Sequence, residues 1–295
     1  MTHALVEARN LTLRYARGKR AALDGVSFDL QPGRVVGLLG HNGAGKTSLM
    51  KVLVGLKAAQ GSLAVLGRQP MRDRSSLLAD LSYIPDVAVL PRWARVRELI
   101  QLMSGLQPRF SAERARQLLR RTSVGLDDRV KHLSKGMVVQ AHLALIASID
   151  ARLMILDEPT LGLDVLSRKS FYEMLIDEWC DGERSVLIST HQVEEIEALL
   201  TDVLMLDEGK LVLNLSLEAI ESRFVALSHH PDVAEAVAAA HPLLRYRAQG
   251  GQPAALFDGE PPAQLVAQAQ RFRPNLVDLF VALTRKPELA PRSPA

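Results

Sequence analysis

Residues 40–47 constrain the fold of this 295-residue chain more than any other stretch. They read Gly-His-Asn-Gly-Ala-Gly-Lys-Thr and lie between the apolar run 35–39 and a helix-like segment, residues 47–53. The glycines let successive backbone N–H groups point into one concavity, which is how a turn binds phosphate groups. Because this kind of loop works between a buried strand and a helix, its context predicts a phosphate-binding loop in an α/β fold.

Each part of the loop has a chemical role. The glycines supply the turn, and the helix that follows brings a positive dipole end of about half a charge to the phosphates. Lys46 can reach the β- and γ-phosphates, and the Thr47 hydroxyl can ligate Mg²⁺. His41 is expected to contribute only its backbone. The residues expected to bind the phosphates of a nucleotide in this segment are Gly40, His41, Asn42, Gly43, Ala44, Gly45, Lys46, Thr47 and Ser48.

Composition excludes several other classes of site. The single cysteine, Cys180, excludes an internal disulfide and a cysteine-based metal cluster. A net charge of +3 suits an anionic ligand or a nucleic acid equally well, and so decides nothing. No window approaches the roughly 18 apolar residues of a membrane helix, and the amino terminus lacks the pattern of a signal peptide. We therefore expect that the chain neither spans nor crosses a membrane by itself.

The remaining pattern predicts strands and helices around the loop. Strand-like runs are expected at residues 4–13, 26–30, 61–67 and 81–85. The pattern is helical from about residue 86 to residue 134, with apolar residues on one side of each helix. Two later units place a helix before a buried strand: helix 138–149 before strand 152–157, and helix 171–179 before strand 185–189. Such units predict a mostly parallel sheet with ligands at the carboxyl ends of its strands.

Polar residues stand at these strand ends. Asp157 closes one buried strand and can hold Mg²⁺ directly or through water, whereas Glu158 points differently and can polarise an attacking water molecule. His191 follows the next buried strand. Hydrolysis of a phosphate anhydride needs a metal, a carboxylate beside the water and further donors at the γ-phosphate. The sequence therefore offers a candidate for each role in the hydrolysis of a phosphate anhydride.

The order of these motifs resembles that of the ATP-binding-cassette (ABC) ATPases over about residues 4–215. Residues 133–137, Leu-Ser-Lys-Gly-Met, resemble the signature motif of that family, and residues 161–164, Leu-Gly-Leu-Asp, look like its D-loop. The resemblance implies an α/β P-loop NTPase with a RecA-like mixed sheet, an antiparallel β subdomain and a helical signature subdomain at about 87–134. It also implies that Ser134 and Gly136 contact the γ-phosphate of ATP bound to another chain, so that a dimer completes the site.

Further roles follow from the same resemblance. Tyr15 matches the aromatic residue that stacks on adenine, and His191 matches the histidine that bonds the γ-phosphate near Glu158. Asp86 stands where the family usually has glutamine. A carboxylate can also ligate Mg²⁺, but it adds negative charge near the γ-phosphate. The resemblance thus implies that Glu158 and His191 are catalytic, and that the metal ligands are Thr47, Asp157 and Asp86.

An amphipathic helix is expected near residues 276–283. Within the family, the signature and the segment 274–284 that contains this helix resemble those of the nucleotide-binding subunits of ABC-2-type bacterial exporters. This subgroup implies a separately encoded membrane permease and a second ABC subunit, identical or different, as partners, at the cytoplasmic face of the cell membrane. Because the family docks the coupling helices of its permease on the helical segment, Trp93 is an interface candidate. The expected domains are 1–215 and a small C-terminal region, 216–295, with a disordered tail.

Two other functions remain open. The arginine-rich segment between residues 92 and 129 also fits a soluble ABC ATPase that acts on ribosomes or DNA. Such proteins usually carry two cassettes or a long coiled coil, and this chain shows one cassette without sustained heptads, so nucleic acid is not expected as a partner. A nucleotide-dependent regulator without turnover is compatible with Asp86.

Overall fold

The computed structural model describes residues 4–16, 20–86, 90–179, 182–248 and 251–284. Its centre is a six-stranded sheet. In spatial order the strands are β5 (Leu81–Ile84), β6 (Leu153–Asp157), β7 (Ser185–Ser189), β3 (Val35–Leu39), β8 (Asp202–Asp207) and β9 (Lys210–Ser216). All neighbours pair in parallel except β8 and β9.

The parallel strands carry the predicted motifs to one edge of the sheet. Strands β3, β6 and β7 are buried along their full length, as expected of strands that are covered on both faces. Their carboxyl ends lie side by side, because β7 pairs with both β3 and β6. This arrangement confirms the predicted parallel core and explains why the loop after β3 faces the acid pair after β6.

A second sheet covers one face of this core. It consists of β2 (Leu23–Leu30), β1 (Val6–Leu13) and β4 (Gln60–Val65), all antiparallel. Helix α1 (Lys46–Leu53) follows the loop, and its apolar residues join those of the antiparallel sheet and the central sheet in one buried cluster. The short helix α2 (Arg74–Asp80) leads into β5 and was absent from the sequence expectations.

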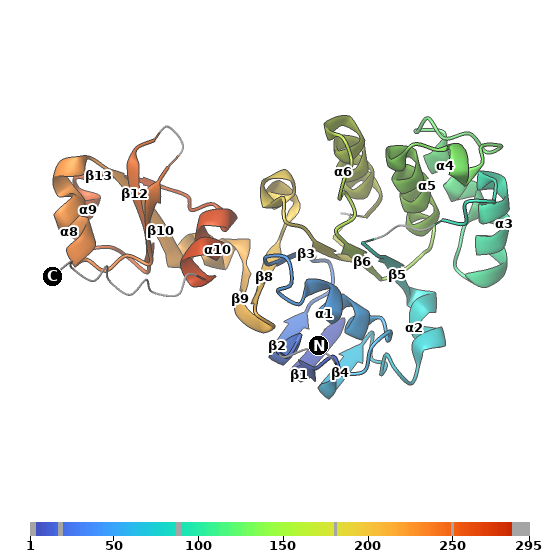
Figure 1. The fold of residues 1–295 in the computed structure, drawn as a ribbon, viewed down its shortest axis with the longest axis horizontal. Helices are drawn as coiled ribbons and strands as arrows, with labels where there is room; N and C mark the ends of the chain where they lie inside the picture. Colours follow the sequence, from blue (N-terminus) through green and yellow to red (C-terminus); the bar gives the residue numbers. More distant parts are fainter. Residues whose placement is uncertain (1–3, 17–19, 87–89, 180–181, 249–250, 285–295) are drawn as a thin grey trace.

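The helical segment lies beside the β5 and β6 edge of the central sheet, on the right in Figure 1. It contains α3 (Val96–Leu106), α4 (Ala112–Leu119), the 3-10 turn η1 (Val130–His132) and α5 (Lys135–Ala147). The residues predicted to line the inner faces of α3 and α4 are buried or partly buried, and the two helices pack on α5. Helix α6 (Val165–Trp179) precedes β7 and packs beside α5.

The C-terminal region folds into a third sheet, which sequence patterns did not predict. After the turns η2 (Val193–Glu195) and η3 (Glu197–Leu199), β9 continues into α7 (Leu217–Arg223). The elements that follow are β10 (Phe224–His229), η4 (Pro231–Val233), α8 (Ala234–Ala239), β11 (Leu244–Arg247), β12 (Pro253–Asp258), α9 (Ala263–Val266), β13 (Ala269–Phe272) and α10 (Leu276–Thr284). The sheet order is β11-β12-β10-β13, fully antiparallel, which is the ferredoxin-like split βαβ arrangement.

Helix α10 lies between this third sheet and the central sheet (Figure 1) and confirms the helix predicted at the end of the chain. The expected disordered tail falls outside the described residues. Among the helices of the described ranges, none has the length and apolar character that crossing a membrane requires.

Candidate functional site

The loop after β3 has the backbone shape that the glycines predict. Gly43 and Gly45 have φ angles of 88° and 115°, in the region that favours glycine. A Cβ atom on Gly40 would lie 2.6 Å from the carbonyl oxygen of Leu206. Only glycine therefore lets the loop fold this tightly against the end of β8.

Lys46 lies inside the loop that precedes it. Its side chain is almost fully buried, and Nζ donates hydrogen bonds to the carbonyl oxygens of Gly40 at 2.7 Å and His41 at 3.4 Å. The Glu158 carboxylate lies 3.4 Å from the same Nζ. A buried ammonium needs such partners, and the arrangement fixes a positive charge where phosphates would meet the loop.

The His41 side chain also makes contacts, although only its backbone was expected to contribute. Its Nδ1 lies 2.7 Å from the carbonyl oxygen of Asn42, and its Nε2 lies 3.0 Å from Oδ1 of Asp207, at the end of β8. Both partners are hydrogen-bond acceptors, and the contact from Nε2 to Asp207 links the loop to the end of β8. The contact joins segments more than 160 residues apart, and no local sequence signal marks Asp207 as a partner.

Asp157 is fully buried at the carboxyl end of β6. Ser189 Oγ donates to its Oδ1 at 2.8 Å, whereas Oδ2 has no hydrogen-bond partner within the described part of the chain. Burial raises the pKa of Asp157, and the charges of Asp86 and Glu158 add to this effect. The hydrogen bond from Ser189 and the nearby Thr47 hydroxyl oppose it. A buried carboxylate oxygen without a donor, close to the Thr47 hydroxyl, fits the oxygen-ligand set that Mg²⁺ prefers.

Glu158 and His191 face each other across the same edge. Glu158 has a φ of 46°, which turns its side chain away from that of Asp157. His191 Nδ1 lies 2.7 Å from Glu158 Oε2. Ser189 supports both acids, because its hydroxyl also accepts the backbone N–H of Glu158 at 2.9 Å. Sequence reasoning missed Ser189; the available signal was its place in a buried strand, where it pairs in register with Asp157.

One cavity of about 330 Å³ brings these groups together. Its lining includes residues of the loop and of the start of α1 together with Asp86, Glu158 and His191, whereas Asp157 does not line it. Tyr15 lies beside it, with Oη 3.2 Å from Ser48 Oγ. Its ring is 40% exposed, which leaves it accessible to an adenine base. The signature residues Ser134 and Gly136 do not line this cavity.

Comparisons with known proteins give the family. The ABC transporter family matches residues 23–161. Over 219 residues the chain is 32% identical to the Nod factor export ATP-binding protein I of Paraburkholderia xenovorans, covering 72% of this chain and 71% of the relative. The chain belongs to the ABC transporter ATP-binding proteins. It is also 33% identical to the aliphatic sulfonates import ATP-binding protein SsuB 2 of Streptomyces avermitilis, over 74% of this chain and 83% of the relative.

A solved structure agrees with this assignment. The protein described as "Structure of ATP binding subunit of ABC transporter" superposes with a TM-score of 0.67 at 27% identity, covering 74% of this chain and 92% of that one. The chain is therefore an ABC ATPase with the expected P-loop fold, and it binds ATP. The two relatives named above serve export and import, so kinship alone does not fix the direction of transport.

The ABC signature motif has a defined place in the fold. Ser134 caps α5, since its Oγ accepts the backbone N–H of Met137 at 3.2 Å. This cap starts the helix at Lys135, three residues before the predicted start. Gly136 is buried against α6, where a Cβ would lie 2.5 Å from Ser167 Oγ. Lys135 reaches the D-loop, because a Cβ on Gly162 would lie 2.2 Å from its Nζ.

Proposed function

We propose that the chain is the ATP-hydrolysing subunit of an ABC-2-type exporter, and that closure of an ATP-bound dimer drives a separate membrane permease. The observation that carries the proposal is the cavity where the phosphate loop, Asp86, Glu158 and His191 meet, while the signature of the same chain lies elsewhere. The proposed direction, export, rests on the resemblance of the signature and of segment 274–284 to those of ABC-2-type exporter subunits. The proposed location is the cytoplasmic face of the cell membrane.

Thr47 and Asp86, which line the cavity, and the buried Asp157 would hold Mg²⁺, which neutralises charge on the phosphates when bound. Glu158 accepts a hydrogen bond from the attacking water and takes up its proton. His191 orients Glu158 through the contact at Oε2, and Lys46 stabilises the negative charge of the transferred phosphoryl group. Asp86 brings a third carboxylate to the site, and its negative charge repels the phosphates of ATP. ATP binding should therefore depend more strongly on Mg²⁺ than it would with glutamine at this position.

A second chain would complete the site. Apolar side chains are exposed around the D-loop: Leu161 is 50%, Val165 77% and Leu166 78% exposed. Such a group of exposed apolar residues is typical of an interaction surface. A partner chain that covers it would bring its own Ser134 and Gly136 to the ATP held here.

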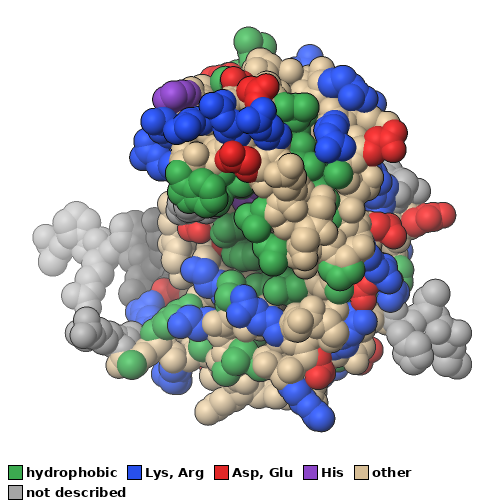
Figure 2. Space-filling model, turned by 90° about the vertical axis from the view of Figure 1, so that its right-hand side faces the viewer, with side chains coloured by type: hydrophobic (Ala, Val, Ile, Leu, Met, Phe, Trp, Pro, Cys, Tyr) green, Lys and Arg blue, Asp and Glu red, His purple; other side chains and the backbone are tan. Residues whose placement is uncertain are grey.

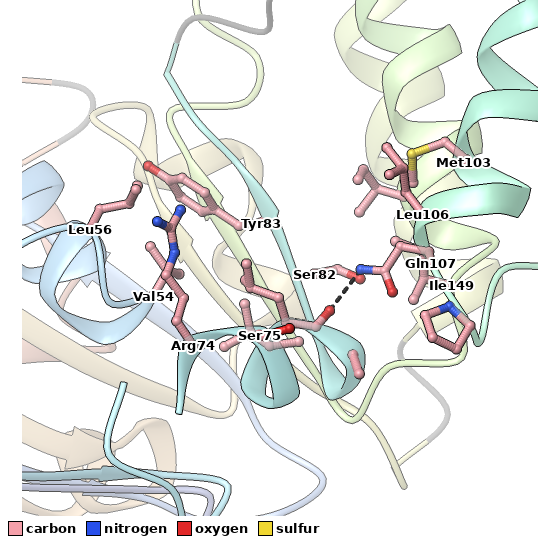
Figure 3. Close-up of a pocket in the computed structure, with 15 residues that line it drawn as sticks. Val54, Leu56, Arg74, Ser75, Ser82, Tyr83, Met103, Leu106, Gln107 and Ile149 are labelled. Atoms are coloured by element: carbon pink, nitrogen blue, oxygen red, sulfur yellow. Dashed lines mark hydrogen bonds between the residues drawn. The ribbon is translucent and has the colours of Figure 1, made fainter. Parts of the chain in front are cut away.

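The permease would dock in a groove on another face. A cavity of about 520 Å³ lies between the segment with α2 and β5 and the helices α3 and α5. Figure 2 shows a hollow lined by hydrophobic side chains on this side, with lysine and arginine side chains along its upper border. In Figure 3, Tyr83 and Arg74 lie near Leu56 on one side of the groove, and Met103 and Leu106 lie on the other side. Gln107 Nε2 donates to the carbonyl oxygen of Leu78 at 2.7 Å.

Exposure in the groove supports docking of an amphipathic helix. Leu106 is 68% exposed and Leu56 is 40% exposed, although both border the same cavity. A helix that lays its apolar face here would bury them. Trp93 does not line the groove, but it is 72% exposed and remains an interface candidate on the neighbouring surface.

The structure gives less support to the nucleic-acid alternative. Several arginines of the helical segment are bound to acidic side chains: Arg97 to Asp127, Arg109 to Asp80, and both Arg114 and Arg121 to Glu178. Paired arginines offer fewer free charges to a phosphate backbone. RNA or DNA that stays bound through high salt during purification would favour this alternative.

Co-purification, ATP binding and closure of the two ABC subunits test the proposal. We expect the chain, expressed with its neighbouring genes, to co-purify with a protein that has several membrane spans.

In the complete transporter, the Glu158→Gln variant should bind ATP with Mg²⁺ and hold the two ABC subunits closed. Introducing Ser134→Arg should prevent this closure, while a matched change at exposed Ser123, outside the signature, should not. Failure to bind ATP in calorimetry would refute the proposal.

A further inference from the structure

A second cavity lies in the C-terminal sheet and shares no lining residue with the ATP cavity. Its volume is about 360 Å³. This size falls within the range of about 300 to 1,000 Å³ that is usual for small-molecule sites. Its polar and aromatic lining includes Tyr246, Gln252, Gln270, Phe272 and Asp278.

The fold creates this cavity by covering only part of one sheet face. The opposite face packs on α8 and α9 through a small apolar core that includes Val225 and Phe257. On the cavity face, α10 packs on the apolar part of the sheet, near Phe224 and Leu256. Along β10, alternate residues on this face change from apolar Phe224 to polar Ser228, which lines the cavity. The polar part of this sheet face, around Ser228, therefore lies outside the apolar core.

Charge is unbalanced in this cavity. Two charged residues line it, Arg273 and Asp278. Arg273 is bound to Glu221 at 2.8 Å, whereas Asp278 has no ion-pair partner among the residues that the structure describes. Burial raises the pKa of Asp278, and the neighbouring Tyr246 and Asn275 side chains oppose this rise. A partly buried carboxylate without a cation is unfavourable, and a positively charged ligand would relieve that cost.

Two aromatic side chains, Tyr246 and Phe272, line the cavity together with Asp278. Tyr246 Oη is buried and makes no hydrogen bond of normal geometry within the described ranges, although it lies close enough to Asp278 to influence its pKa. Phe272 lines the same space. Aromatic faces attract cations, most strongly where water is excluded. A site that presents rings, amide oxygens and one carboxylate, and whose Arg273 is already paired with Glu221, therefore favours a cation over an anion or a neutral molecule.

We propose that this cavity binds a small organic cation, a protonated amine or a quaternary ammonium compound. Asp278 is the counter-ion, Tyr246 and Phe272 pack against the charged group, and the oxygens of Gln252 and Gln270 accept hydrogen bonds from it. The described residues hold no cluster of three or more His, Cys, Asp or Glu side chains suited to a metal ion, which makes an organic cation the better fit. The site is independent of the proposed transport function.

Calorimetry on the full chain at about 0.1 M NaCl tests the proposal, because this salt concentration screens exposed charges. The probes are putrescine and choline, with 1,4-butanediol as the neutral counterpart of putrescine. We expect saturable binding of one cation per chain and none of the diol. Asp278→Asn should weaken binding at least tenfold. Asp232→Asn, which removes the same charge from a side chain that is 85% exposed in the same sheet region, should leave binding unchanged.

A second variant separates binding from folding. Asp278 lies in the first turn of α10, so its replacement can also destabilise that helix. Ala248→Leu fills the cavity from its rim without changing charge and should abolish cation binding while ATP binding persists. The proposal is wrong if neither cation binds at 10 mM, if the diol binds equally well, or if folded Asp278→Asn and Ala248→Leu proteins bind like the wild type.

Discussion

Replacing Ser189 by alanine tests how the acid pair is held. The Ser189 hydroxyl donates to Asp157 Oδ1 at 2.8 Å and accepts the backbone N–H of Glu158 at 2.9 Å. Asp157 and Ser189 are both fully buried, and Asp157 Oδ2 already lacks a donor among the described residues. The substitution would remove the donor that Oδ1 now has from Ser189 and leave the N–H of Glu158 without this acceptor.

The magnitude follows from these two contacts. A hydrogen bond to a charged group contributes about 1.5–3 kcal/mol, and a buried group left without a partner costs about 1–3 kcal/mol. Because relaxation recovers part of each term, we expect Ser189→Ala to lower the free energy of unfolding by about 2–4 kcal/mol. Loss of the hydrogen bond also raises the pKa of Asp157 further and should weaken Mg²⁺-dependent ATP binding.

Urea denaturation in metal-free buffer at pH 7, with ATP–Mg²⁺ titration of the folded variant, measures both effects. Ser82→Ala is the matched control, because Ser82 is also buried in the central sheet but its Oγ has no hydrogen-bond partner in the described structure. That variant should be neutral or slightly more stable. Equal stabilities of the Ser189 and Ser82 variants would refute the reasoning about how the acid pair is held.

Three further predictions concern other parts of the molecule. Leu106→Asp should weaken co-purification of the permease, whereas Leu102→Asp, on the same helix but outside the groove lining, should not. His41→Leu should raise the KM for ATP more than it lowers kcat, because the loop loses its link to Asp207; an unchanged KM would contradict this. Burial lowers the pKa of His142 from 6.5 to about 4, so the unfolded chain binds a proton first as pH falls. Stability should therefore decrease by up to about 3 kcal/mol between pH 6.5 and pH 4, and His142→Leu should remove that decrease in acid unfolding curves.

The sequence identified the parts of the site that depend on local chemistry. Glycine spacing predicted the loop, because only glycine permits the backbone shape at Gly43 and Gly45. The buried strands placed Asp157, Glu158 and His191 at one edge, which the pairing of β6 and β7 confirms. Ser189 and the contact between His41 and Asp207 were not predictable, because they join residues that are distant in the sequence.

The C-terminal sheet escaped prediction for a different reason. Its strands have four to six residues, and α9 has four, so no segment shows enough periods of alternation to mark an element. Their stability comes from packing against one another rather than from local preference. Helix α10 was predicted because seven of its nine residues are apolar.

Phosphate release tests the central claim, ATP hydrolysis at Glu158, most directly. Wild-type transporter and the Glu158→Gln variant are compared at equal ATP occupancy in a single-turnover assay with Mg²⁺. Glutamine keeps the size of the side chain but cannot take the proton of the attacking water, so the account predicts rapid release by the wild type and a rate at least a hundredfold lower in the variant. Equal rates would contradict it.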